Sequence, residues 1–386
     1  MNVVLLSPHF PLNFYNFAVG AHRVGLNVLG IGEAPYAMLR DELREALTEY
    51  YWVETMEDYN SLLRACAHFI HRYGRIHRLE SHNEYWLETD ARLRTDFNIP
   101  GLRLSDMEKT KHKSIMKQVF AGAGVEVARG QIMSTLAAAR EFIAEVRYPV
   151  VFKPNVGVGA AGVFKICCDD ELERFFAEKP GEDYLMEEFI PGQLYSFDGL
   201  ADQNGQPVFY TAHFYQPGIM DVVNYDLDVF ACSFREIPEG LEDAGLKAVR
   251  AFDVRERFFH IEFLRRDQDE RWIAVETNMR PPGGRMLDVI NYANNIDLYR
   301  QWANIVALNT FTAEYTRPYH CAFVGRKEHR KHKHTHAEIL AALRPLIVHH
   351  ESIAPVFARA MGNYGYLVRS PDMNVLQEAI EFILES

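Results

Sequence analysis

Two acidic side chains in one predicted hairpin constrain this chain more than any other feature. Segments 260–266 and 271–278 have the composition of strands, and a polar turn joins them. In a hairpin centred on residue 269, Glu262 lies opposite Glu276, because each is seven residues from the centre. Like charges directly opposite each other destabilise a sheet. A cation bound between them removes that cost, so the pattern predicts a cation site.

The predicted cation site has three oxygen ligands. Asn278 lies two residues beyond Glu276 and therefore shares its face of the strand. Two carboxylates and an amide oxygen are hard ligands that suit Mg²⁺ or Mn²⁺. Arg280 follows at the start of a Pro-Pro-Gly-Gly turn, as a fixed cation beside the metal. The alternative is an ordinary hairpin whose acidic side chains are solvated.

A glycine-rich segment is the second candidate site. Gly157, Gly159 and Gly162 match the G-x-G-x-x-G pattern. A helix follows the glycines in a dinucleotide-binding fold, whereas segment 163–167 is β-branched and aromatic. We therefore predict a hairpin whose backbone N–H groups cover the phosphates of a nucleotide, with Lys153 neutralising phosphate charge. The alternative is a glycine-rich turn with Lys153 extending from a strand into solvent.

An apolar strand at 184–188 ends in Glu187 and Glu188, and continues into Phe189 and Ile190 before a Pro-Gly turn. Such a segment can connect two lobes and pair its backbone with the edge of a base. An ordinary strand end has the same pattern.

The order of the predicted elements divides the chain into three parts. Strands and helices alternate over residues 1–105, which predicts an α/β domain with a parallel, doubly wound sheet. Residues 106–310 begin with a Lys-rich helix at 106–121 and then follow an α+β, strand-rich pattern. The remainder is expected to be helical or mixed. Its predicted helices are 336–345 and 374–384, and another is predicted earlier, at 292–308.

Composition narrows the class of protein. With 386 residues, 48% of them hydrophobic, the chain is long enough for two or three packed domains. A net charge of -12 argues against nonspecific nucleic-acid binding, which needs a basic surface. The basic run 326–336 is interpreted as a solvated loop that leads into a helix, rather than as a metal or phosphate site.

Location is predicted from three further observations. No apolar run reaches the ~20 residues of a membrane helix. The first residues lack the basic and apolar regions of a signal peptide. Five scattered cysteines indicate a reducing compartment. We therefore expect a cytoplasmic protein with no membrane partner.

The Lys-Pro strand, the glycine-rich hairpin, the Glu-Glu-Phe-Ile-Pro-Gly segment and the Glu-x-Asn-x-Arg hairpin occur in the order typical of the ATP-grasp superfamily. The chain resembles the carboxylate–amine ligase branch of that superfamily over residues 106–310. Residues 1–105 look like the Rossmann-like domain that precedes the grasp. The resemblance implies an ATP-grasp fold with a mobile lid at 149–200 and a segment, 311–386, that completes the grasp region.

The resemblance also implies roles for the candidate residues. Lys113, with Lys109 as the competing choice, and Lys153 contact the phosphates of ATP, and Arg280 lies near the transferred phosphate. Leu194 stands where many relatives carry a ribose-binding glutamate, so the ribose contact must come from elsewhere. The adenine hinge comprises Glu187, Glu188, Phe189 and Ile190, the glycine loop Gly157, Gly159 and Gly162, and the metal ligands Glu262, Glu276 and Asn278.

The implied reaction joins a small-molecule carboxylate to an amine, amino acids among the candidates, through an acylphosphate. It consumes ATP with Mg²⁺ or Mn²⁺ and releases ADP and phosphate. A phosphotransferase on the same fold is one alternative. A nucleotide-binding module without catalysis is another, and Leu194 is its best support. The family also suggests a homodimer.

Overall fold

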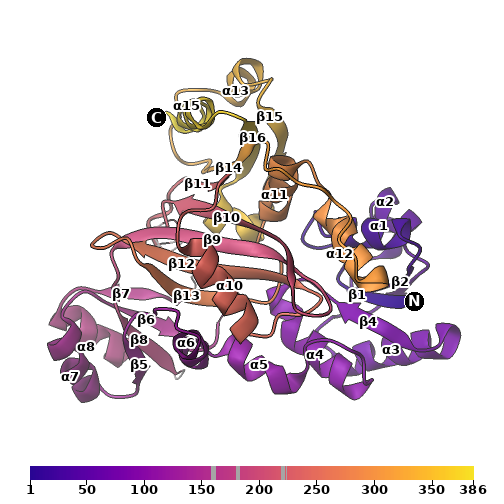
Figure 1. Cartoon of the computed structure of the whole chain (residues 1–386), viewed down its shortest axis with the longest axis horizontal. Coiled ribbons are helices and arrows are strands. Elements are labelled where there is room, and N and C mark those ends of the chain that lie inside the picture. The colour runs from indigo at the N-terminus through magenta and orange to yellow at the C-terminus, as the bar shows by residue number, and fades with distance from the viewer. Residues whose placement is uncertain (158–161, 180–182, 219–221, 223) are drawn as a thin grey trace.

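The computed structural model describes residues 1–157, 162–179, 183–218, 222 and 224–386 (Figure 1). In this part of the chain the named strands form three sheets. A four-stranded sheet belongs to the N-terminal part, an eight-stranded sheet occupies the centre, and a smaller four-stranded sheet lies at the lower left of Figure 1.

The N-terminal sheet is parallel, as predicted, with strand order β3-β2-β1-β4. Alternate residues of its strands face opposite sides, and both sides are covered. Val3 and Leu5 pack with Phe17 of α1, whereas Val4 and Leu6 pack with Phe69 of α3. The elements are β1 (Asn2–Leu6), α1 (Tyr15–Arg23), β2 (Asn27–Gly32), η1 (Tyr36–Met38), α2 (Asp41–Ala46), β3 (Glu49–Trp52), α3 (Tyr59–Tyr73), β4 (Ile76–Glu80), η2 (Glu84–Trp86) and α4 (Leu87–Asp96).

The single helix predicted at 106–121 is wrong, because two helices occupy the region: α5 (Leu104–Lys111) and α6 (Lys113–Gly122). His112, with ψ of 108°, interrupts them. Asn155 stabilises the interruption, since its backbone oxygen accepts from the N–H of Lys113 at 2.9 Å and its side-chain oxygen from the N–H of Ser114 at 3.0 Å. The break places Lys113 at the start of a new helix.

The small sheet has the order β5-β8-β6-β7, and the predicted glycine-rich hairpin is confirmed. Phe152 pairs with Phe164 and Val150 with Ile166. Helices α7 and α8 pack against the side that carries Val150 and Phe152. Gly159 lies outside the described residues. The elements are β5 (Gly130–Met133), α7 (Leu136–Val146), β6 (Val150–Pro154), β7 (Phe164–Ile166), α8 (Asp169–Glu178) and β8 (Tyr184–Glu188).

The central sheet is antiparallel, with the order β13-β12-β9-β10-β11-β14-β16-β15. One face packs its aromatic side chains, such as Phe197 and Phe259, against α6 and α10 (Leu241–Ala251). The helix predicted at 292–308 is wrong in part, because Asn295, with φ of 51°, separates α11 (Met286–Asn294) from α12 (Leu298–Leu308). The strands of this part are β9 (Gly192–Ala201), β10 (Pro207–Gln216), β11 (Val229–Ser233), β12 (Phe258–Arg266) and β13 (Trp272–Asn278).

The C-terminal part supplies three strands that were not predicted, and they extend the central sheet beyond β11 (Figure 1). Its first strand pairs with β11, and Gly325 lies opposite Gly365 in the next pairing. The two predicted helices are present with shifted ends. The elements are β14 (His320–Arg326), α13 (His336–Ala342), β15 (Ile347–Ser352), α14 (Pro355–Met361), β16 (Tyr364–Ser370) and α15 (Met373–Leu384).

The basic run 326–336 is not solvated throughout, which corrects the sequence interpretation. Lys327 is 2% exposed, and its ammonium donates to the carbonyls of Ala358 at 2.9 Å and Arg359 at 2.6 Å. His332 lies 3.0 Å from the carboxylate of Asp228. The run therefore ties β14 to the end of α14. Among the described residues, no helix has both the length and the apolar character needed to cross a membrane.

Candidate active site

The pairing of Glu262 with Glu276 is confirmed, and it arises by a different route from the one predicted. Near the turn the register is shifted by one residue, so that Phe263 pairs with Ala274 instead of Val275. A β-bulge at this point restores the predicted register for the two glutamates. The bulge lies next to the acidic pair.

The two carboxylates lie in different electrostatic surroundings. Burial and the carboxylates of Glu262 and Glu84 raise the pKa of Glu276, while its carboxylate lies 3.2 Å from the ammonium of Lys113. Burial opposes the charge on Glu262, but His260 and Arg280 hold the pKa of Glu262 below its usual value. Glu276 therefore binds a proton more tightly than Glu262 does.

Lys113 reaches this site because of the break between α5 and α6. Its side chain is 4% exposed, and its ammonium also donates to the carbonyl of Gly157 at 3.3 Å. The lysine thus connects the acidic hairpin of the central sheet with the start of the glycine loop. Lys109, the competing choice, lies in α5, on the other side of the break.

Lys153 and Glu187 lie on the side of the small sheet that α7 and α8 do not cover. The ammonium of Lys153 is 2.6 Å from one carboxylate oxygen of Glu187, and Lys117 binds the other oxygen. Burial opposes the charge, but the two ammonium groups lower the pKa of Glu187. Lys117 was not predicted, although its position one helical turn beyond Lys113 places both lysines on one face of α6.

Hydrogen bonds within the protein already use some of the backbone N–H groups of the predicted adenine hinge. The N–H of Glu188 donates to the carbonyl of Arg129 at 3.0 Å, and the N–H of Phe189 to that of Pro149 at 3.3 Å. The carboxylate of Glu188 binds the Arg129 side chain. In the part of the chain that the structure describes, the N–H of Ile190 is the one of these three backbone donors that makes no hydrogen bond.

Two of the three loop glycines lie within the described residues. Gly162 has a φ of +73°, and a Cβ atom there would lie 3.1 Å from the Cγ atom of Pro154. A larger residue would therefore be strained by its backbone conformation. Gly157 contributes the carbonyl that accepts from Lys113.

Arg280 binds a residue that the sequence analysis missed. Its Nε atom lies 3.0 Å from Glu84, in the N-terminal domain, and its NH2 group binds the same oxygen. With its amide nitrogen toward Glu84, Asn278 donates to both carboxylate oxygens, at 3.1 and 3.3 Å. This orientation turns the amide oxygen of Asn278 away from Glu84. No local pattern marks Glu84, because its partners lie in a distant part of the sequence.

A second contact joins the N-terminal domain to the acidic hairpin. The buried guanidinium of Arg257 donates to the carbonyl of Met279 at 3.0 Å and to Glu80 of β4 at 2.8 Å. Met279 stands between Asn278 and Arg280. The N-terminal domain is therefore linked to the end of β13 twice, by Glu80 of β4 through Arg257 and by Glu84 of η2 directly.

The donor set fits a magnesium ion that is completed by phosphate. Within the described residues, no cluster of three or more His, Cys, Asp or Glu side chains is arranged to hold a metal ion. Mg²⁺ is usually bound by one or two carboxylates together with substrate phosphates and water. Glu262 and Glu276 supply that number of carboxylates, beside the lysine that reaches the glycine loop.

A family model of the ATP-grasp domain matches residues 146–288 of this chain. The chain contains an ATP-grasp domain. The match begins just before β6 and ends in α11, so it includes Lys153, Glu187 and the acidic hairpin. Lys113 and Glu84 lie before the matched stretch.

Solved structures with this ATP-grasp fold cover nearly the whole chain. The L-amino acid ligase of Bacillus licheniformis has a TM-score of 0.75 at 14% identity, with 98% of this chain and 96% of that chain covered. The N5-carboxyaminoimidazole synthetase of Staphylococcus aureus has a TM-score of 0.69 at 13% identity, with 100% and 97% covered. These likenesses confirm the predicted fold, an N-terminal parallel sheet followed by an ATP-grasp region.

Curated relatives match over shorter stretches. The uncharacterized protein y4rH of Sinorhizobium fredii is 30% identical over 132 residues, which are 31% of this chain and 27% of that protein. The carbamoyl phosphate synthase large chain of Clavibacter michiganensis is 24% identical over 197 residues, 47% of this chain and 17% of the relative. The chain thus spans about a quarter or less of the length of these relatives.

Leu194, which the resemblance places where many relatives carry a ribose-binding glutamate, is partly buried in β9. Its side chain packs with the apolar cluster that contains Tyr215 and Val229. The side chain of the preceding Gln193 binds the backbone carbonyl of Tyr215.

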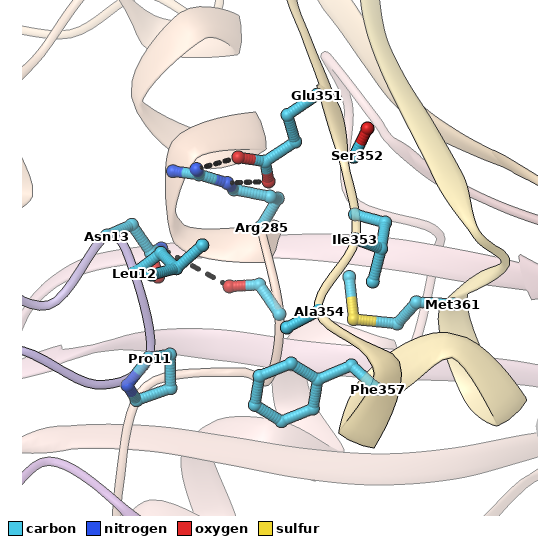
Figure 2. Close-up of a pocket in the computed structure, with 11 residues that line it drawn as sticks. Pro11, Leu12, Asn13, Arg285, Glu351, Ser352, Ile353, Ala354, Phe357 and Met361 are labelled. Atoms are coloured by element: carbon cyan, nitrogen blue, oxygen red, sulfur yellow. Dashed lines mark hydrogen bonds and ion pairs between the residues drawn. The ribbon is translucent and has the colours of Figure 1, made fainter.

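Figure 2 shows a pocket between the N-terminal domain, the turn that follows Arg280, and α14. Its polar side is occupied, because the guanidinium of Arg285 binds Glu351 with two nitrogens and lies 3.0 Å from Asp288. Phe10 stacks on Phe357, with ring centroids 5.3 Å apart. The pocket is lined by Pro11, Leu12, Asn13, Gly284, Arg285, Glu351, Ser352, Ile353, Ala354, Phe357 and Met361.

Proposed function

We propose that this chain is an ATP-dependent ligase that joins a carboxylate to an amine through an acylphosphate. The observation that carries the proposal is the position of Lys113, whose ammonium contacts both Glu276 and the carbonyl of Gly157. One cation thus joins the acidic hairpin to the glycine loop. Phosphoryl transfer needs this combination of positive charge, carboxylates and backbone donors around one reacting group.

The nucleotide would lie between the small sheet and the central sheet. Lys113 and Lys153 would neutralise its phosphates, and the N–H of Ile190 would contact the base. Glu187 of β8 holds the ammonium of Lys153 in place on the face of the small sheet that α7 and α8 do not cover. Glu262, Glu276 and the amide oxygen of Asn278 would hold Mg²⁺ or Mn²⁺. When bound, the ion neutralises phosphate charge and orients the phosphoryl group.

The reaction then has two steps. An oxygen of the substrate carboxylate attacks the γ-phosphorus, the bond to the bridging oxygen breaks, and ADP leaves. The amine attacks the acyl carbon, phosphate leaves with its oxygen, and the nitrogen loses a proton. Arg280 would orient the carboxylate, because a guanidinium binds an oxygen pair in a fixed plane. Closing the glycine loop would keep water from the acylphosphate.

The pocket of Figure 2 supports a substrate with an apolar side chain. It begins four residues beyond Arg280, and the hydrogen bond from Asn13 to the carbonyl of Gly284, at 3.3 Å, fixes its wall. Arg285 is already neutralised by two carboxylates, so a second anion gains little from binding there. Phe357 and Met361 offer apolar surface instead. We propose that amino acids with small apolar side chains are among the substrates.

Phosphate release from Mg-ATP in the presence of single amino acids and pairs of them tests the proposal. With the correct acid, hydroxylamine should intercept the acylphosphate and give a hydroxamate, and the native amine should give an amide and ADP in equal amounts. AMP and pyrophosphate as products would exclude the acylphosphate, because they indicate adenylation.

Two alternatives give different products. A phosphotransferase on the same fold would release ADP and a stable phosphorylated compound, with no amide. A nucleotide-binding module would show no hydrolysis that depends on a second compound. The buried lysines and carboxylates around the glycine loop favour catalysis, because a module without phosphoryl transfer does not need them.

A further inference from the structure

A row of buried polar side chains crosses the central sheet on the side that carries the acidic pair. Register places the row on neighbouring strands: His260 pairs with Asp198 of β9, and Glu262 pairs with Ser196. On β10, His213 pairs with Ser196. Asp198, Ser196 and His213 are 0% exposed. Such a row is unusual in a sheet core, where buried carboxylates are costly unless they are fully paired.

Asp198 is the centre of this row. Its Oδ1 atom lies 2.6 Å from Nδ1 of His260, and its Oδ2 atom lies 2.7 Å from Nδ1 of His213 and accepts from the hydroxyl of Ser196. The hydroxyl of Ser196 lies 3.2 Å from that of Tyr215. The carboxylate therefore has partners on both oxygens, which fix its plane within the sheet.

His260 differs from His213 in what its second nitrogen meets. Nε2 of His260 lies 3.3 Å from Oε1 of Glu262. Within the described residues, Nε2 of His213 is buried and has no hydrogen-bond partner. Asp198 thus binds both imidazole rings, and only the ring of His260 also contacts the acidic pair, through Glu262.

We propose that His260 is a positioning residue that, anchored by Asp198, holds Oε1 of Glu262 and leaves its other oxygen directed to the cation. The inference rests on the proposed role of Glu262 as a metal ligand. Outer partners of this kind fix the orientation of a ligand, and their loss typically weakens metal affinity roughly 10- to 100-fold.

The alternative is that the row is only a satisfied polar core, in which the contact with Glu262 has no consequence. The two histidines separate these interpretations, because both contact Asp198 and only His260 contacts Glu262. Substitutions by asparagine keep a nitrogen near the position of Nδ1 and remove Nε2. His260→Asn should therefore retain the bond to Asp198 and lose the bond to Glu262, and His213→Asn is the matched control.

Binding of Mn²⁺ to the full chain tests the proposal without an activity measurement. Electron paramagnetic resonance measures this binding as a decrease in the signal of free Mn²⁺. We expect His260→Asn to weaken Mn²⁺ binding roughly 10- to 100-fold. His260→Gln, whose amide nitrogen falls near the position of Nε2, should recover part of the affinity. His213→Asn should bind as the wild type does, and Glu262→Gln should lose most of the binding.

Three outcomes would contradict the proposal, and each has a different meaning. Wild-type affinity in His260→Asn, with weak binding in Glu262→Gln, overturns the positioning role and leaves the metal site intact. Equal losses in His213→Asn and His260→Asn indicate a structural role of the whole row. Wild-type binding in Glu262→Gln overturns the metal site itself. If His260→Asn does not fold, Asp198→Asn is compared with His213→Asn: weaker Mn²⁺ binding in Asp198→Asn than in His213→Asn supports the role, and equal binding in the two variants contradicts it.

Discussion

Glu84, which follows the last strand of the N-terminal sheet, binds the guanidinium of Arg280 at the end of the central sheet. Both side chains are largely buried, at 14% and 15% exposed. The contact fixes Arg280 beside the acidic pair from outside the matched ATP-grasp stretch. The N-terminal domain is therefore a structural part of the candidate site.

Arg280→Lys should lose most of the activity although the charge is retained. A lysine cannot contact Glu84 and a substrate carboxylate with separate groups in one plane. Loss of one preorganised donor costs roughly 10²–10³ in rate. Hydroxamate formation with Mg-ATP measures the change. Arg271→Lys is the control, because Arg271 is 66% exposed and also pairs with acids. Equal activities of the two variants would contradict the role of Arg280.

Glu262→Gln and Glu276→Gln should each abolish ATP-dependent turnover while cooperative unfolding persists. Each amide keeps the shape of the side chain and removes one of the two charges that would hold the ion. Circular dichroism establishes the fold, and phosphate release measures turnover. Glu270→Gln, in the exposed turn of the same hairpin, is the control. Near-normal activity of both variants would show that the pair does not bind the metal.

Lys153→Met should weaken ATP binding or slow turnover more than it lowers stability. Lys117 still neutralises Glu187 in this variant, so the loss in unfolding free energy is limited to roughly 1–3 kcal/mol. Fluorescence titration with ATP and thermal unfolding separate the two effects. Lys117→Met removes the other partner of Glu187 and is the comparison. Unchanged nucleotide binding in Lys153→Met would assign this lysine to structure alone.

His82 should make the fold sensitive to acid. It stacks on Phe17 at a centroid distance of 3.7 Å, and burial holds the pKa of His82 at about 3, below its ordinary value of 6.5. Between these values the unfolded chain binds a proton that the folded chain does not, so stability falls as pH falls below 6.5.

At pH 5 the titration of His82 lowers the free energy of unfolding by about 2 kcal/mol, because each pH unit below 6.5 costs about 1.4 kcal/mol. His82→Phe keeps an aromatic ring between Phe17 and Trp302 and removes the titrating group. Urea unfolding of both proteins at pH 7 and pH 5 measures the difference. The variant should lose less stability on acidification than the wild type, and parallel losses would contradict the prediction.

Phe357→Ala should change substrate preference and leave the ATP site intact. The ring forms part of the apolar wall of the small pocket, so its removal should raise KM for amino acids with small apolar side chains, with little effect on KM for ATP. Val356→Ala is the matched control, because Val356 is 71% exposed on the same helix. A uniform fall in kcat for all substrates would argue against a role in substrate selection.

Local sequence was sufficient to predict the hairpins and the pairing of the two glutamates, but not the β-bulge between that pair and the turn. Glu262 and Glu276 could be placed opposite each other because both lie near one short turn. The glycine-rich hairpin was predicted for another local reason, because a β-branched and aromatic segment follows its glycines. Short loops leave few alternative registers, and a buried face selects among them.

Features that depend on distant contacts were missed. The break at His112 is stabilised by Asn155, and the role of Glu84 depends on Arg280 and Asn278. The C-terminal strands were missed because β14 gains its order from pairing with β11. In each case the partner is far away in sequence, so no local pattern records it.

The paired contacts of Glu80 with Arg257 and of Glu84 with Arg280 bear on protein engineering. A chimaera that combined this N-terminal domain with another ATP-grasp domain would separate two buried ion pairs across its junction. Glu80 would keep Arg94, 2.7 Å away in the same domain, but Arg257 would lose the carboxylate of Glu80. A buried charge that loses its counter-ion costs several kcal/mol. The N-terminal domain can be exchanged between such proteins only if all four side chains are present in the chimaera.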